Sequence, residues 1–123
     1  MTKILTNDEI NQFKKDGAVF LKGKFDTSWI KKLQKGIERD IKNPSPRFKS
    51  HTTQKGVPAY LEDYWTWHLI PEFKEFVYDS PYAKIASDLM SAKKINLVMD
   101  NWFLREGGSK SKTPFHHCLL YTS

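Results

Sequence analysis

The chain has 123 residues, of which 39% are hydrophobic and 14% aromatic, and its mean hydropathy is −0.60. This length allows one domain with a real core and argues against disorder throughout. No apolar run approaches the roughly 18 residues of a membrane-spanning helix, and the N-terminus lacks an apolar signal segment. The single cysteine, Cys118, excludes an internal disulfide and a multi-cysteine zinc site. We therefore expect a soluble, cytoplasmic protein without a membrane partner.

The net charge is basic. Twenty Lys and Arg residues against fourteen Asp and Glu residues give +6 at pH 7. A basic balance is typical of proteins that bind nucleic acid or another polyanion. Here, however, the basic residues are spread from Lys3 to Lys112 and alternate with acids, and the densest windows, 31–35 and 110–112, are short. We interpret them as a solvated surface, which does not favour nucleic acid as a partner.

The first predicted element is a helix with clear ends. Thr6 and Glu9 have the spacing of a capping box, in which each side chain accepts from the other residue's backbone N–H. Gly17 supplies the left-handed conformation that commonly ends a helix. The apolar run 18–21 then predicts a short strand that ends at Gly23.

A second helix is predicted to begin at Asp26 or Thr27 and to end before Pro44. Its apolar residues recur at spacings of three and four, which is typical of one buried helical face: Trp29, Ile30, Leu33, Ile37 and Ile41. Residues 44–58 predict a loop longer than usual, of the kind that can form a lid over a site.

The middle of the chain is less distinct. The aromatic stretch 60–67 fits either a helix or a loop. Residues 71–78 predict a short helix that buries Phe73, Phe76 and Val77. The pair Ser80–Pro81 then predicts the start of a further helix, in which Ile85, Ala86, Leu89 and Met90 lie on one side.

The last third predicts strands. Residues 94–105 alternate, with Ile95, Leu97 and Met99 on one face. A loop containing Gly107 follows, and 113–116 predicts another strand. Because isolated two-stranded ribbons are marginal in water, we expect the sheet to be incomplete. The chain is then one partial domain. Residues 1–93 form a mainly helical part that includes one short strand, and residues 94–117 form strands.

Four histidines are candidates for chemistry: His51, His68, His116 and His117. We expect His51 to be a loop residue and His68 to be packed beside its aromatic neighbours. His116 and His117 point to opposite faces if they lie in a strand, so only one of them can serve a given site. Cys118 is a poor nucleophile candidate, since no orienting third residue is evident.

Two motifs in order carry a family resemblance. The opening Leu5-Thr6-Asn7-Asp8-Glu9-Ile10, with Asp16-Gly17 after it, resembles the start of the phytanoyl-CoA dioxygenase family. The stretch 100–108, followed by Thr113-Pro114-Phe115-His116-His117, is similar to the strand and loop that lead into that family's iron-binding H-x-D motif. The likeness runs at intervals from residue 5 to residue 117, and the middle third is unspecific.

The resemblance implies an α+β chain in which N-terminal helices lead into the first strands of a double-stranded β-helix, the jelly-roll or cupin barrel. It implies an oxygenase that uses Fe(II), O2 and 2-oxoglutarate to hydroxylate a small or lipid-like substrate. Two histidines and one carboxylate hold iron in such enzymes and leave open positions for cosubstrate and dioxygen.

Carried over by position, His116 matches the first iron-binding histidine, and Cys118 stands where the family has its carboxylate. Asn101 lies near a family position that contacts 2-oxoglutarate, and a polar strand residue without a ligand fits it equally well. We expect Asp100 to be a hydrogen-bonded turn or sheet residue and Arg105 to be a surface or loop-anchoring charge. The second histidine and the 2-oxoglutarate arginine have no counterpart in this sequence.

Residues 118–123 also resemble translated sequencing-adapter read-through, and we expect them not to be native. The chain is then a fragment that does not turn over by itself. The alternative hypothesis is a small basic module that binds nucleic acid or another polyanion through Tyr64, Trp65 and Trp67 with nearby lysines. Because Glu62 and Asp63 would repel phosphate, we favour the interpretation that these aromatic residues cover helix and sheet faces.

Overall fold

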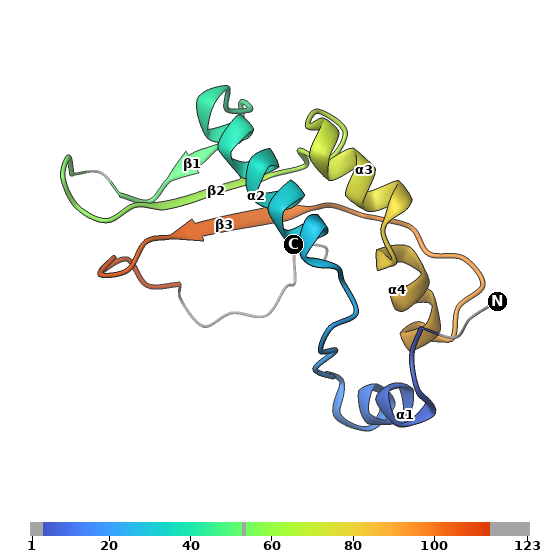
Figure 1. Ribbon diagram of the computed structural model, residues 1–123. Helices are drawn as coiled ribbons and strands as arrows, with labels where there is room; N and C mark the ends of the chain where they lie inside the picture. Colours follow the sequence, from blue (N-terminus) through green and yellow to red (C-terminus); the bar gives the residue numbers. More distant parts are fainter. Residues whose placement is uncertain (1–3, 53, 114–123) are drawn as a thin grey trace, which may run out of the picture.

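The computed structural model describes residues 4–52 and 54–113. These residues form an α+β fold with four helices and a three-stranded antiparallel sheet in the order β1-β2-β3 (Figure 1). The elements are α1 (Asn7–Asp16), α2 (Thr27–Lys42), β1 (Lys49–Ser50), β2 (Tyr60–Tyr64), α3 (Pro71–Asp79), α4 (Tyr82–Met90) and β3 (Asn101–Arg105). In the described part of the chain, no helix is long and apolar enough to cross a membrane.

Helix α1 has the ends that the sequence predicts. The Thr6 N–H donates to Glu9 Oε2 at 2.7 Å, and the Glu9 N–H donates to Thr6 Oγ1 at 3.2 Å. Gly17 has φ +72°, and its N–H donates to the carbonyl of Phe13. The Thr6 N–H bond, together with a bond that Lys24 donates to the Glu9 carboxylate, lowers the pKa of Glu9 below its ordinary value. The capping box is confirmed.

The strand predicted at 18–21 is wrong. The sheet of the described residues does not include this segment, and Phe20 is 84% exposed. A four-residue apolar run becomes a strand only when a neighbouring strand takes up its backbone hydrogen bonds. Residues 1–93, for which the sequence predicts one short strand at 18–21, instead contain the two strands β1 and β2 among the described residues.

Helices α2 and α3 pack against each other beside the sheet (Figure 1). Asp26 caps α2 by accepting from the Ser28 N–H at 2.8 Å, as predicted. The two helices meet at Gly36, which is buried against the Phe73 ring; a Cβ built there would lie 2.4 Å from Phe73 Cε1. A glycine at this place lets the helices approach closely.

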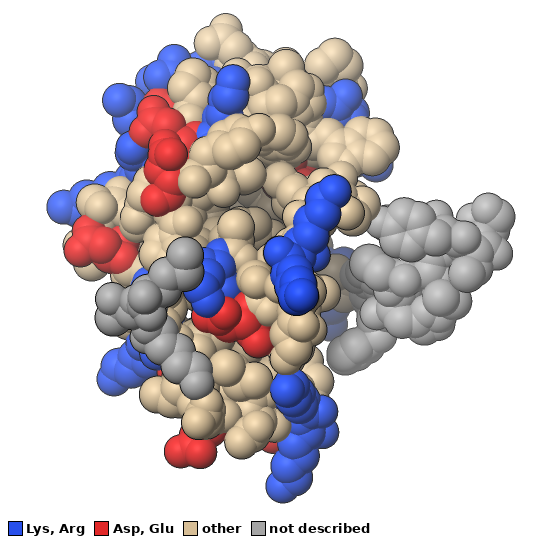
Figure 2. Space-filling model, turned by 90° about the vertical axis from the view of Figure 1, so that its right-hand side faces the viewer, with Lys and Arg blue, Asp and Glu red and all other residues tan. Residues whose placement is uncertain are grey.

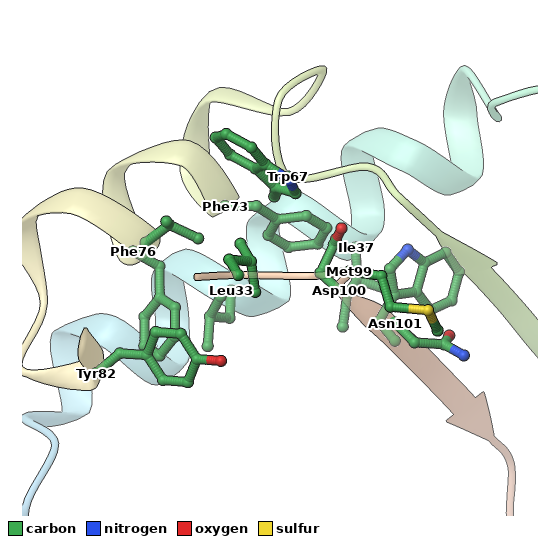
Figure 3. Close-up of a pocket in the computed structure, with 12 residues that line it drawn as sticks. Leu33, Ile37, Trp67, Phe73, Phe76, Tyr82, Met99, Asp100 and Asn101 are labelled. Carbon is green, nitrogen blue, oxygen red and sulfur yellow. The ribbon is translucent and has the colours of Figure 1, made fainter. Parts of the chain in front are cut away.

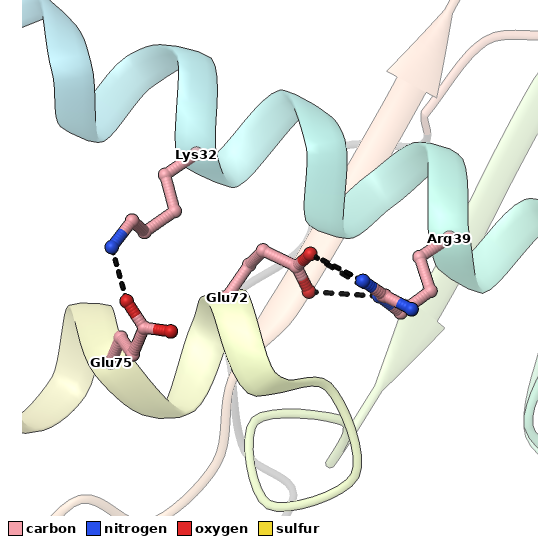
Figure 4. A network of polar contacts seen from close by, with 4 residues as sticks. All are labelled: Lys32, Arg39, Glu72 and Glu75. Atoms are coloured by element: carbon pink, nitrogen blue, oxygen red, sulfur yellow. Dashed lines mark hydrogen bonds and ion pairs between the residues drawn. The ribbon is translucent and has the colours of Figure 1, made fainter.

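Two ion pairs join the same helices (Figure 4). Arg39 donates to Glu72 from Nε at 3.0 Å and from Nη2 at 2.8 Å, and Lys32 pairs with Glu75. Glu72 is only 6% exposed, so this pair is partly shielded from water. The Arg39 guanidinium holds the pKa of the Glu72 carboxyl below its ordinary value.

The aromatic stretch 60–67, which the sequence leaves undecided, begins as strand β2 and ends as a turn before α3. The strand predicted at 94–105 is shorter in the structure, because only Asn101–Arg105 pairs with β2. Residues 94–100 lie outside the sheet, yet the predicted alternation persists in their burial: Ile95, Leu97 and Met99 are half-buried, whereas Asn96 and Val98 are exposed.

The core lies between the helices and one face of the sheet. Ile70, Phe73 and Trp102 are buried at its centre. Partly buried apolar residues surround them: Leu33, Ile37, Ile41, Phe48, Leu61, Trp67 and Leu104. Because successive strand residues point to opposite faces, Trp102 and Leu104 face the helices and their neighbours in β3 face away. The predicted helical faces of α2 and α3 are thus confirmed in the main.

Candidate functional site

The sheet face opposite the helices carries mostly polar and aromatic side chains. Cross-strand pairing places Tyr60 beside Arg105, Glu62 beside Phe103, and Tyr64 beside Asn101. Lys49 of β1 pairs with Glu62 and therefore lies on the same side. We call these seven residues the open face. It comprises Lys49, Tyr60, Glu62, Tyr64, Asn101, Phe103 and Arg105.

Asn101, the predicted 2-oxoglutarate contact, is exposed at the start of β3. In Figure 3 its amide lies at the β3 end of a cavity and points away from Phe73 and Trp67. The position is compatible with both interpretations given by the sequence, a ligand contact or a polar strand residue. Its neighbours on the open face are Tyr64 across the strand pair and Phe103 two residues along.

The cavity itself has a volume of about 370 Å³ and lies between the helices and the end of β3 (Figure 3). Its lining is mainly aliphatic and aromatic, from Leu33, Ile37, Trp67, Phe73, Phe76, Val77, Tyr82, Leu97 and Met99 together with residues 100–102. A cavity with such walls suits an apolar group. Among the described residues that line it, Asp100 alone carries a carboxylate, and Thr66 donates to this carboxylate from its N–H and its Oγ1. Asp100 is thus the hydrogen-bonded residue that the sequence predicts.

His51 contacts two residues of the open face, Tyr60 and Glu62. It follows β1, its ring lies 4.7 Å from the Tyr60 ring, and its Nε2 lies 3.2 Å from Glu62 Oε1. Tyr60 is buried under these contacts, and its hydroxyl bonds Thr113 Oγ1 at 2.9 Å. By contrast His68 is exposed. Its ring nevertheless lies 5.8 Å from the Trp67 ring in an edge-to-face contact, so the predicted packing beside an aromatic neighbour is confirmed for Trp67.

Arg105 anchors the loop after β3, as the sequence predicts. Its Nη2 donates to the carbonyl of Ser109 at 3.1 Å, and its guanidinium lies 6.0 Å from the centre of the Tyr60 ring. The loop turns at Gly108, which has φ +86°. Glu106, at the start of the same loop, joins it to the residue before β2 by accepting from the Ala59 N–H at 2.6 Å.

Three carboxylates, those of Asp40, Asp63 and Asp100, lie near one another on the helix side of the sheet. The sequence motifs do not reveal this cluster. Asp40 of α2 is 3% exposed and accepts from Trp102 Nε1 at 2.9 Å. Asp63 of β2 is fully buried and accepts from the Ser45 hydroxyl at 2.8 Å. Burial, with Asp63 and Asp100 nearby, raises the pKa of Asp40 to about 6. One sequence signal indicates that Asp40 is buried, since it lies three residues after Ile37 on the apolar face of α2.

The proposed metal ligand lies outside these contacts. His116 and Cys118 lie outside the described residues, which end at Thr113. The strand expected to start at Thr113 would continue into the same undescribed range, 114–123. Within 4–52 and 54–113, no group of three His, Cys, Asp or Glu residues could hold a metal ion. The described residues therefore do not form an iron site by themselves.

The charged side chains form no single basic surface on the face shown in Figure 2, where Lys and Arg are spread among Asp and Glu. This agrees with the scattered pattern in the sequence. Comparison with known proteins finds no matching family model, no matching curated protein and no matching solved structure.

Proposed function

We propose that this chain is the N-terminal part of an Fe(II)- and 2-oxoglutarate-dependent oxygenase similar to the phytanoyl-CoA dioxygenases. The whole enzyme hydroxylates a small or lipid-like substrate with O2, and the 123-residue chain by itself is inactive. The proposal is supported by the order of the two sequence motifs and by the α+β arrangement, in which helices cover one face of an antiparallel sheet.

The observation that carries the proposal is the position of Asn101. Small jelly-roll barrels bind their ligands inside, on the face that their external helices do not cover. Asn101 lies on the open face, whereas Trp102 beside it faces the helices. In the proposal the three strands are the first part of a jelly-roll barrel, the open face is its interior, and Asn101 contacts 2-oxoglutarate there.

The iron site of the proposal needs His116, a second histidine and a carboxylate at the position that Cys118 occupies. When bound, the metal and cosubstrate supply the oxidising chemistry. The described residues contribute the open face, on which the polar side chain of Asn101 lies beside the aromatic Tyr64 and Phe103.

Sequencing the source gene across codon 117 tests the proposal directly. We expect an acidic residue in place of Cys118, and further on a histidine and an arginine within strands. A genuine stop codon directly after Ser123 would overturn the proposal, because the three-ligand site could not form. The purified chain of 123 residues should release no succinate from 2-oxoglutarate in the presence of Fe(II), and detection of succinate would contradict its predicted inactivity.

A further inference from the structure

We propose that Arg47, Lys49, Tyr64 and Trp65 form a platform that binds single-stranded nucleic acid. An unpaired base stacks on the exposed indole of Trp65, and the neighbouring phosphates pair with the two cations. This function goes beyond the proposed oxygenase. It belongs to the 123-residue chain, in which Lys49 and Trp65 are exposed, and it requires neither iron nor 2-oxoglutarate. It also uses only part of the aromatic set in the alternative hypothesis, because Trp67 packs against the core.

Trp65 has an unusual backbone. Its φ is +56°, a left-handed conformation that bulky side chains rarely adopt. Two contacts hold it there, since its N–H donates to the Asp100 carbonyl at 3.0 Å and its own carbonyl accepts from Arg47 Nη2 at 2.9 Å. The result is an indole that is 47% exposed. Strained positions that the surrounding structure fixes are concentrated at functional sites.

The two cations lie beside the rings. Arg47 also donates from Nε to the Tyr64 carbonyl at 2.9 Å, so its guanidinium is fixed at two points. Its central carbon lies 6.0 Å from the centre of the Tyr64 ring and 5.9 Å from that of Trp65. Lys49 Nζ lies 6.0 Å from the Tyr64 ring centre. The aromatic rings and the two positive charges thus form one continuous surface.

The acidic neighbours do not oppose an anionic ligand here, contrary to what their sequence positions suggest. Asp63 is fully buried on the helix side of the sheet, where Ser45 and the Tyr64 N–H donate to it. The Glu62 side chain is only 15% exposed, and its Oε1 lies 3.2 Å from His51 Nε2. The charges that lie against the Tyr64 and Trp65 rings are the cations Arg47 and Lys49, which is the complementarity that a phosphate backbone requires.

A single strand fits this platform better than a duplex does. Bases in a duplex are stacked on one another, whereas unpaired bases can stack on protein side chains. Only two cations contribute, so the platform should contact about two phosphates, and affinity should fall with salt concentration with a log–log slope of about −1.4.

The test is fluorescence anisotropy with the full chain and a labelled oligo(dT) of about 12 nucleotides, which is within the usual site size. Trp65→Gly removes the indole and relieves the strain at φ +56°, so the variant should fold normally and bind at least about tenfold more weakly. Lys49→Ala should lower the magnitude of the salt slope by about 0.7. The matched controls, Phe20→Ala and Lys74→Ala, alter exposed residues elsewhere and should bind as the original chain does.

Three results would overturn the inference. One is the absence of salt-dependent binding to oligo(dT). Another is equal binding of heparin and oligo(dT) with no effect of Trp65→Gly, which would indicate general attraction of polyanions. The last is equally tight binding of thymidine monophosphate, which would indicate a free nucleotide and not a strand. None of these results bears on the gene sequence beyond codon 117, so failure here leaves the oxygenase proposal standing. Likewise, a stop codon after Ser123 would overturn the oxygenase proposal and leave the platform untouched.

Discussion

Replacement of Asp40 by asparagine should stabilise this protein at pH 8 and have little effect at pH 4. Asp40 joins α2 to β3 through Trp102 Nε1, and it is 3% exposed. Asparagine has nearly the same shape and keeps an oxygen that can accept from the indole. It cannot ionise, however, so the buried site no longer carries a negative charge beside Asp63.

The magnitude follows from the pKa of Asp40, which burial raises from 3.8 to about 6. A raised pKa means that the folded state binds the proton more tightly than the unfolded state does. The contribution of the group to stability is therefore fully present below pH 3.8 and is lost as the pH rises through about 6. One pKa unit corresponds to about 1.4 kcal/mol, so the loss above that range amounts to about 3 kcal/mol.

Urea unfolding of both proteins from pH 4 to pH 8 measures this difference. The free energy of unfolding of Asp40→Asn should exceed that of the original chain by about 3 kcal/mol at pH 8, and the difference should disappear towards pH 4. Asp79→Asn, at an exposed position in α3, is the matched control and should show no such dependence. A difference that is the same at pH 4 and pH 8 would refute the argument, because the proton on Asp40 would then not be linked to folding.

Further predictions concern the contact between α2 and α3. Gly36→Ala should lower the free energy of unfolding by about 1–3 kcal/mol, since the added Cβ overlaps the Phe73 ring, and a gain in thermal stability would contradict this packing. Arg39→Lys should lower the free energy of unfolding, because lysine cannot donate two parallel bonds to the buried Glu72. Lys32→Ala, which removes the more exposed pair, should cost less than about 1 kcal/mol, and urea titrations that rank these two substitutions in the opposite order would contradict the difference in burial.

The helices could be predicted because their signals are local. Thr6 and Glu9 lie three residues apart, so the capping box that begins α1 is visible in the sequence. The apolar spacing of α2 similarly identifies Leu33 and Ile37 as core residues. These features depend on residues within one or two helical turns, where the geometry of the backbone is fixed.

The strands were harder to predict because their stability depends on partners that lie far away in the sequence. Residues 18–21 are as apolar as many strands, yet no strand of the described sheet lies beside them. The stretch 60–67 becomes a strand at its start because it pairs with β3, about forty residues later. Alternation identified Ile95, Leu97 and Met99 as half-buried, but it could not reveal that the pairing begins only at Asn101. Nor could it reveal that in β3 the even-numbered residues, Trp102 and Leu104, face the core.

The candidate sites depend on long-range contacts in the same way. A positive φ is expected from the sequence only at glycine, so nothing local indicates it at Trp65. The conformation is held by Arg47, eighteen residues earlier, and by Asp100, thirty-five residues later. Such contacts also turn Asp63 inward, which removes the negative charge that the sequence places beside the aromatic residues. The sequence thus supplies the residue types of the platform, whereas the sheet and its turns determine which charges remain at the surface and which ligand they can attract.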